Sequence, residues 1–284
     1  MTGPAGPVGL PACARHPDRP TGLSCTRCGR PACVECLRDA SVGQQCVDCV
    51  REGSRGSRRA TTVAGAPPGG KPLVVPVLMA LNIALFVFTA AQARSIGSND
   101  RAALFREWVL VPGRVDTDWW TPLTSGFLHY GPLHLAFNMF ALWIIGRDLE
   151  LVLGRGRFLA VYLVALLGGS ASVLVFTAPN TATAGASGAV FGLMGGYFVV
   201  ARRLRVPTQQ VVTLIAINLA IGFIPGSSLS VAGHLGGLVV GGLATAAIVH
   251  APNVRNRTLM QVGAIAVLTI VVLSVIVGRA AVVA

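Results

Sequence analysis

The stretch TATAGASGAVFGLMGG, residues 181–196, carries the strongest indication of how this chain folds. It opens a long apolar run, and its glycines Gly188, Gly192 and Gly196 recur every four residues. Such a ridge of small residues lets two membrane helices approach closely. Ser187 stands directly before the ridge, so it is either one more small packing residue or a nucleophile that the glycines leave room for.

The composition predicts an all-α polytopic membrane protein. Of the 284 residues, 53% are hydrophobic and only 12% are charged, and the apolar stretches have about the 20 residues that a helix needs to cross a bilayer. The net charge of +12 is spread in short groups between these stretches, so we expect no nucleic-acid partner. The candidate spans are 72–93, 124–146, 157–177, 186–201, 208–224, 230–250 and 259–278.

The basic residues predict the orientation of these spans. They precede the first span and follow the second, fourth and sixth, whereas the short connections APNTATA and PGSSL carry no charge. Because basic loops remain in the cytoplasm, the N-terminus is predicted to be cytoplasmic. Spans two, four and six then begin on the outer face, and their first turns can share one site that opens toward that face.

Polar residues occur in those first turns, where burial in a membrane is costly and function is the default hypothesis. His134 and Asn138 are four apart and share one face of the second span. His129 points elsewhere, which favours a structural hydrogen bond. Ser187 begins the fourth span and His234 lies about one turn into the sixth.

A second glycine ridge on the sixth span would bring His234 toward Ser187. The two side chains would then form a nucleophile and a general base. No Asp or Glu follows Glu150 in the sequence, so we expect a dyad without a carboxylate. The second ridge consists of Gly233, Gly237 and Gly241.

An acyl-transfer site also needs donors for the developing oxyanion. The backbone N–H of Ser187 at a helix N-terminus is one candidate. The side chains of Asn138 and His134 are the others.

These residues resemble the rhomboid family of intramembrane serine proteases through HYGPLHLAFN, GASG and GHLGG, which occur in the family's order on spans two, four and six. The resemblance covers residues 72–250 and implies a six-helix core there, with a loop and an extra, seventh transmembrane helix in 251–284. It implies hydrolysis of peptide bonds in or near transmembrane segments of membrane protein substrates, without a cofactor for catalysis. Ser187 is then the nucleophile, His234 the base and Asn138 and His134 the oxyanion-stabilising residues, with supporting roles for His129, Gly185, Gly188 and Phe191.

One position departs from the family pattern. Rhomboids commonly carry Trp-Arg in the first outer loop, whereas this chain has Trp120 followed by Thr121.

Two other functions remain open: a catalytically silent rhomboid-like protein that binds membrane helices and recruits partners, and a transporter with an intramembrane polar site. No convincing internal repeat supports the transporter.

A cysteine-rich head precedes the membrane domain at residues 12–50. Its potential ligands form four pairs, and two residues separate the members of each pair. The eight ligands are the number that two tetrahedral zinc sites require. Disulfides are the rival reading, but seven cysteines leave one unpaired and the predicted compartment is reducing. The eight candidate ligands are Cys13, His16, Cys25, Cys28, Cys33, Cys36, Cys46 and Cys49.

The head loosely resembles cross-braced fingers such as the B-box, which implies that alternate pairs share a metal and that the head binds a protein partner. A Gly-, Ser- and Arg-rich segment at 51–71 is predicted to be a flexible basic linker without a packed core, suited to anionic lipid headgroups. We expect the whole chain in a bacterial cell membrane.

Overall fold

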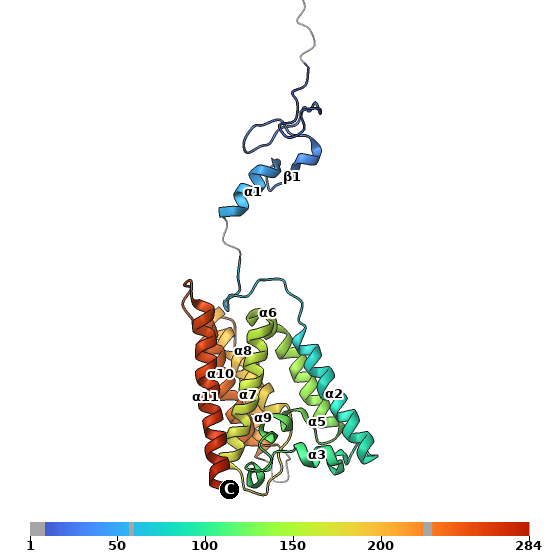
Figure 1. Ribbon diagram of the computed structural model, residues 1–284, viewed down its shortest axis with the longest axis vertical. Helices are drawn as coiled ribbons and strands as arrows, with labels where there is room; N and C mark the ends of the chain where they lie inside the picture. The colour runs from blue at the N-terminus through green and yellow to red at the C-terminus, as the bar shows by residue number, and fades with distance from the viewer. Residues whose placement is uncertain (1–8, 57–59, 224–228, 284) are drawn as a thin grey trace, which may run out of the picture. The chain divides into compact units, whose positions relative to one another are not determined.

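The computed structural model describes residues 9–56, 60–223 and 229–283. They form two compact units, divided between Ala60 and Thr61. The first unit holds the cysteines, and the second holds the long helices shown in Figure 1.

The first unit is built around thiols instead of large apolar side chains. Its buried residues are mostly cysteines, among them Cys13, Cys25 and Cys36. A hairpin of two short antiparallel strands pairs Leu37 with Cys46. The elements are η1 (Val34–Cys36), β1 (Leu37–Asp39), β2 (Gln44–Cys46) and α1 (Val47–Gly56).

The second unit is all helical, as expected of a polytopic membrane protein. Among the described residues, four helices are long and apolar enough to cross a bilayer, and a shorter apolar helix, α9 (Gln209–Gly222), accompanies them. The four are α2 (Val74–Ala93), α7 (Arg155–Phe176), α10 (Val231–Val249) and α11 (Arg257–Val283). Of these helices, α7, α9 and α10 pack against α8 (Ser187–Leu204), whereas α11 packs against α7 and α10.

The second predicted span is interrupted and begins later than expected. Its helix starts at Gly131, whose φ of +73° lies in the left-handed region that glycine tolerates. His129 therefore precedes the helix instead of lying in its first turn. The helical elements here are α4 (Thr121–Thr124), η4 (Ser125–Phe127), α5 (Gly131–Ala141), the π-helical turn η5 (Leu142–Gly146) and α6 (Arg147–Leu153).

The segment between α2 and α4 is tied to the polypeptide that leads into α8. Leu110 and Thr183 form an antiparallel bridge with two backbone hydrogen bonds, and the Gly113 N–H donates to the Pro179 carbonyl at 2.7 Å. Thr121, which departs from the resemblance noted above, is buried, and its hydroxyl donates to the Asp118 carbonyl. The helical turns of this segment are η2 (Asn99–Arg101), α3 (Ala103–Trp108) and η3 (Pro112–Arg114).

Helices α7, α8 and α10 form the centre of the unit, and glycines bring their backbones into contact. A Cβ on Gly192 would lie 2.9 Å from the carbonyl oxygen of Gly237, and one on Gly241 would lie 2.4 Å from the Cα of Gly192. On α7, a Cβ on Gly169 would lie 2.9 Å from the Gly233 carbonyl. Any side chain larger than hydrogen at these positions would separate the helices.

The expectation of an unstructured linker over 51–71 is wrong for two parts of it. Helix α1 continues to Gly56, and Ala64 and Ala66 are buried in the second unit. Thr62 starts a tight turn that is closed by the N–H of Gly65, and its hydroxyl donates to the Val152 carbonyl at 2.6 Å. The small side chains of Ala64 and Ala66 let this turn pack against the helices of the second unit. Residues 57–59 of the predicted linker lie outside the described part of the chain.

A buried carboxylate joins α6 to the start of α2. Both oxygens of Glu150 accept backbone N–H groups, from Leu73 at 2.7 Å and from Val74 and Val75 at 2.9 Å each. The first N–H groups of a helix have no partner within it. Glu150 satisfies three of them and places a negative charge at the positive end of the helix dipole.

Candidate active site

Ser187 and His234 come together where α8 and α10 cross. Ser187 is the first residue of α8, and His234 lies one turn into α10. The distance between Ser187 Oγ and His234 Nε2 is 3.0 Å. Ser230 caps α10 by accepting the Gly233 N–H, which fixes the turn that carries the histidine.

The ring of Phe191 holds the imidazole of His234 in this orientation. The two rings are parallel within 8°, and their centroids lie 4.1 Å apart. Phe191 is one turn after Ser187 on the same helix, so one face of α8 presents both the hydroxyl and the ring that supports its partner. Nδ1 of His234 is buried without a hydrogen-bond partner in the described part of the chain.

His134 reaches the same place from α5, with Gly185 between it and the serine. The N–H of Tyr130 donates to Nδ1 of His134 at 3.2 Å, so in the neutral ring Nε2 carries the proton. A Cβ on Gly185 would lie 2.9 Å from this Nε2 and 3.5 Å from Ser187 Oγ. A side chain at 185 would therefore crowd both groups, and the φ of +138° at this position favours glycine.

Asn138 and His129 lie less directly at the site. Asn138 is buried one turn below His134, and its side-chain nitrogen donates to the His134 carbonyl at 2.9 Å. His129 is fully buried, and its ring nitrogens make no hydrogen bond of regular geometry among the described residues, although its ring interacts with the backbone of Phe127. The ring also packs edge-on against His134 with centroids 5.2 Å apart.

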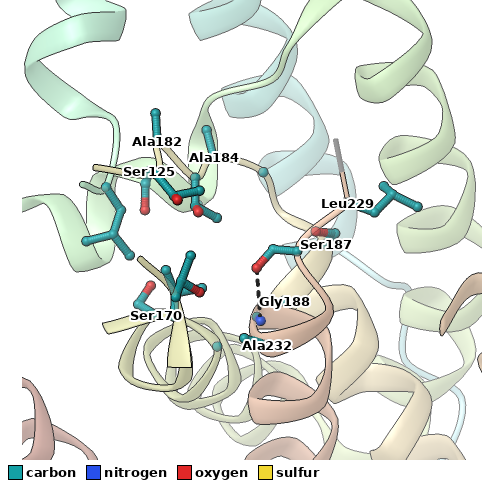
Figure 2. A pocket seen from close by; sticks show the side chains of 18 of the residues that line it. Ser125, Ser170, Ala182, Ala184, Ser187, Gly188, Leu229 and Ala232 are labelled. Atoms are coloured by element: carbon teal, nitrogen blue, oxygen red, sulfur yellow. Dashed lines mark hydrogen bonds between the residues drawn. The ribbon is translucent and has the colours of Figure 1, made fainter. Parts of the chain in front are cut away.

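A cavity of about 440 Å³ opens beside these groups. Figure 2 shows side chains around it, including Ser125, Ser170 and Ser187, from α7, α8 and the segments before α5 and α8. His134 lines it as well, and it mixes polar hydroxyls with small apolar residues such as Ala184. The half-buried Ser187 therefore faces this cavity.

Comparison with known proteins agrees with this geometry. A family model of the rhomboid domain matches residues 116–252. The Bacillus subtilis protein YdcA, which is named for the same family, is 33% identical over 175 residues, which cover 59% of this chain and 84% of that protein. The chain belongs to the rhomboid family.

Two other relatives of this rhomboid chain carry the name protease. Rhomboid protease GluP of Bacillus subtilis is 37% identical over 193 residues, 66% of this chain. Rhomboid protease AarA of Providencia stuartii is 26% identical over 205 residues, which cover 62% of this chain and 72% of that protein. The chain spans only 37% of the length of GluP.

The rhomboid site also depends on residues that sequence reasoning missed. Asn99 is buried; its side chain donates to the His129 carbonyl at 2.8 Å and accepts the Gly131 N–H at 3.0 Å. It thereby holds the turn that starts α5. The Ser125 carbonyl accepts the Gly185 N–H at 3.0 Å. No periodicity marks Asn99, and a backbone acceptor such as Ser125 O leaves no trace in a sequence.

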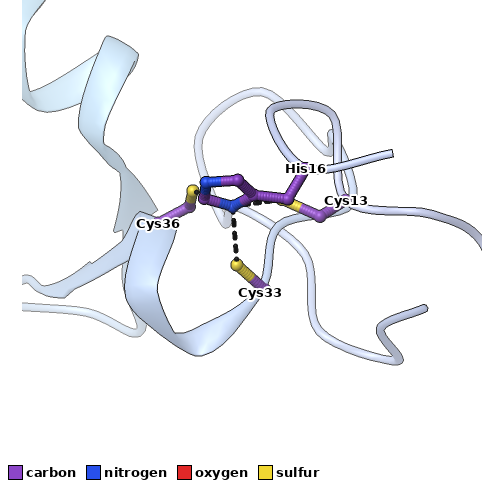
Figure 3. Close-up of side chains that lie close together, drawn as sticks. All are labelled: Cys13, His16, Cys33 and Cys36. Carbon is purple, nitrogen blue, oxygen red and sulfur yellow. Dashed lines mark hydrogen bonds between the residues drawn. The ribbon is translucent and has the colours of Figure 1, made fainter. Parts of the chain in front are cut away.

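The head of this rhomboid protein gathers its eight candidate ligands into two groups of four. Each group has all its ligand atoms within 4.8 Å of one another. Figure 3 shows the ring of His16 between three thiols, with Nδ1 at 3.3 Å from Cys33 Sγ and 3.4 Å from Cys36 Sγ. The groups are Cys13, His16, Cys33, Cys36 and Cys25, Cys28, Cys46, Cys49, the same alternation that the B-box resemblance implies.

The chemistry of these donors fits zinc. Tetrahedral Zn–S bonds of about 2.3 Å separate neighbouring sulfurs by about 3.8 Å, and Cys28 Sγ lies 3.8 Å from Cys46 Sγ. Backbone N–H groups aim at two of the sulfurs: the N–H of Cys33 lowers the pKa of Cys13 to about 6, and that of Cys46 lowers the pKa of Cys25 to about 6. Burial instead raises the pKa of Cys36 to about 11, and the Cys28 side chain raises the pKa of Cys49 to about 12. Thiolates are the form that binds a metal.

Proposed function

We propose that this rhomboid protein is an intramembrane serine endopeptidase that hydrolyses peptide bonds in or near transmembrane segments of membrane protein substrates. The single observation that carries the proposal is the 3.0 Å hydrogen bond between Ser187 Oγ and His234 Nε2. A serine hydroxyl is a weak nucleophile until a neighbouring base accepts its proton. The names of GluP and AarA support the same activity.

In the proposed reaction, Ser187 Oγ attacks the carbonyl carbon of the scissile bond while Nε2 of His234 takes the hydroxyl proton. The tetrahedral intermediate places negative charge on the former carbonyl oxygen. His234 then gives the proton to the leaving nitrogen as the C–N bond breaks, and the acyl group remains on Ser187. A water molecule, deprotonated by His234, hydrolyses that ester and regenerates the serine.

The space between His134 and Ser187, which a side chain at Gly185 would crowd, suits the oxyanion. Its first proposed donor is Nε2 of His134, the nitrogen that carries the proton when Nδ1 accepts from Tyr130. The N–H of Ser187, at the start of α8, is a second donor with the helix dipole behind it. The amide of Asn138 retains one N–H beyond the one given to the His134 carbonyl, and we assign it as a third.

The second candidate function is a silent rhomboid-like protein that binds membrane helices and recruits partners through its zinc head. The presence of two clustered ligand sets is the observation that favours a recruiting head. The intact pairing of Ser187 with His234 argues against silence.

We further propose that the N-terminus is cytoplasmic, in a bacterial cell membrane, with the site open toward the outer face. Contacts gather basic side chains at one end of the helical unit: Arg155 donates to the Lys71 carbonyl, and Arg203 and Arg257 line one cavity. Ser187 lies at the opposite end of α8 from Arg203. Reporter fusions at either end of the chain test this orientation.

The central test is cleavage of a single-span substrate in liposomes by the purified protein. Wild type should cleave, Ser187→Ala should lose activity by at least about a thousandfold, and Ser274→Ala, on an exposed face of α11, should retain it. Equal cleavage by wild type and Ser187→Ala would exclude Ser187 as nucleophile. Binding without cleavage by a folded wild type, across a panel of substrates, would support the recruiting function instead.

A further inference from the structure

At the end of α8 and α10 opposite the Ser–His pair, two hollows adjoin each other. One, of about 370 Å³, is lined by Arg203, His250 and Arg257 together with backbone of the turn at 61–63. The other, a groove of about 480 Å³, is lined by Phe198, Val199, Ala246 and three arginines, and shares Arg203 and His250 with the first. The three arginines are Arg202, Arg203 and Arg205.

Among the described residues, no acidic side chain lines either hollow beside these arginines. Within the described part of the chain, the ion pairs involve Glu35, Asp118 and Asp148, none of which lines either hollow. Arg257 is held at the first hollow by donating to the Val63 carbonyl. The preference for basic residues in cytoplasmic loops explains the sign of the charge, but it does not explain why four arginines line two adjoining hollows.

The groove is polar at its end and apolar one turn deeper. Phe198 precedes Arg202 by four residues on α8, and Ala246 precedes His250 by four on α10, so each helix presents an apolar residue about 6 Å below a polar one. Nδ1 of His250 lies 3.1 Å from the Ala246 carbonyl, so Nδ1 carries the proton toward it and Nε2 remains for another contact. This arrangement matches an amphiphile with an anionic head and a hydrocarbon tail.

We propose that an anionic phospholipid binds here, with its phosphate among Arg203, Arg202 and Arg257 and an acyl chain along Phe198 and Ala246. Guanidinium groups pair with phosphate through parallel N–H···O bonds, and basic pockets between membrane helices are suited to anionic headgroups. A free phosphate would use the arginines but not the apolar wall. The site lies about 24 Å from Ser187 along α8, at 1.5 Å for each of the 16 intervening steps, and its occupancy does not depend on catalysis.

The test uses the full chain, delipidated in a neutral detergent, with bound lipid counted by native mass spectrometry and stabilisation followed by thermal unfolding. Phosphatidylglycerol should bind at least about tenfold more tightly than phosphatidylcholine with the same chains. Arg203→Gln should weaken the binding of phosphatidylglycerol about fivefold. Arg255→Gln, which removes the same charge from an exposed position outside both hollows, should change the affinity for phosphatidylglycerol less than about twofold.

Several results would overturn the proposal. The first is equal affinity for phosphatidylglycerol and phosphatidylcholine, and the second is an equal loss of phosphatidylglycerol affinity in Arg203→Gln and Arg255→Gln. The third is thermal protection by glycerol phosphate as strong as that by the lipid, which would indicate that a free phosphate ester binds. Stronger protection by an acidic peptide than by the lipid would point to a protein segment instead. If Arg203→Gln does not fold, Arg202→Gln removes a charge from the same groove and should show the same loss.

Discussion

Helices α8 and α10 cross at Gly188 and Gly237, and a Cβ on Gly237 would lie 1.9 Å from the carbonyl oxygen of Gly188. This crossing lies directly beside the Ser187–His234 hydrogen bond. The glycine ridges therefore set the distance between the two groups of the proposed dyad, since neither helix can move away without lengthening that bond.

Gly237→Ala should abolish cleavage while retaining the helical content. The added methyl group forces α8 and α10 apart, and overpacking of this kind costs about 1–3 kcal/mol of stability. The matched control is Gly263→Ala on α11, where an added Cβ meets no atom within 4 Å. Cleavage and thermal unfolding in detergent measure the outcome, and a Gly237→Ala protein with normal cleavage would refute the role of the crossing.

Gly185→Ala should reduce kcat by at least about a hundredfold with a smaller loss of stability. Its methyl group would crowd the space between His134 and Ser187, 2.9 Å from His134 Nε2 and 3.5 Å from Ser187 Oγ, on a backbone with φ +138° that side chains rarely adopt. Strain of this kind costs about 1–3 kcal/mol. Gly97→Ala, in open space in the loop after α2, is the control; an active Gly185→Ala enzyme would place the oxyanion elsewhere.

Phe191→Leu should lower kcat/KM about tenfold, because the flat ring that holds His234 is replaced by a flexible aliphatic chain. Phe191→Tyr keeps the ring and should preserve most of the activity. Phe140→Leu, at an exposed phenylalanine of α5, controls for the loss of a ring. If Phe191→Leu and Phe140→Leu behave alike, the stacking does not orient the histidine.

Glu150→Gln should destabilise the helical unit by about 1.5–3 kcal/mol, the range for hydrogen bonds to a charged group. The amide leaves one acceptor oxygen for three N–H groups at the start of α2. Asp148→Asn removes a largely exposed carboxylate from the same helix and should have little effect. The midpoint of thermal unfolding distinguishes the two variants.

The purified chain should contain about two zinc ions, and a strong chelator should remove them together with the structure of the head. Cys33→Ser and Cys28→Ser, one from each ligand group, should each lower the content to about one. Ser41→Ala, at an exposed position of the head, should keep both. Metal analysis gives the count, and a folded head without metal would exclude the zinc assignment.

Much of the fold was predictable because a bilayer restricts the chain to long apolar helices. Residues 74–93 and 155–176 form helices close to the ranges that hydropathy indicated. The glycine spacing likewise indicated which helices approach most closely. The turn at 62–66 was not predictable, because it belongs to a segment whose Gly, Ser and Arg content is typical of a flexible linker. Contacts with distant residues order it: Ala64 is buried, and the Thr62 hydroxyl donates to the Val152 carbonyl.

The sequence alone determined the chemistry that is available: a serine and a histidine at matching depth, no carboxylate after Glu150, and eight candidate metal ligands. Tertiary structure decided which groups meet. Only the crossing of α8 and α10 sets the 3.0 Å contact between residues 47 positions apart, and only the turn held by Asn99 keeps His129 out of α5. Local periodicity records which face of a helix is buried, whereas distances between helices depend on backbone contacts that no single segment encodes.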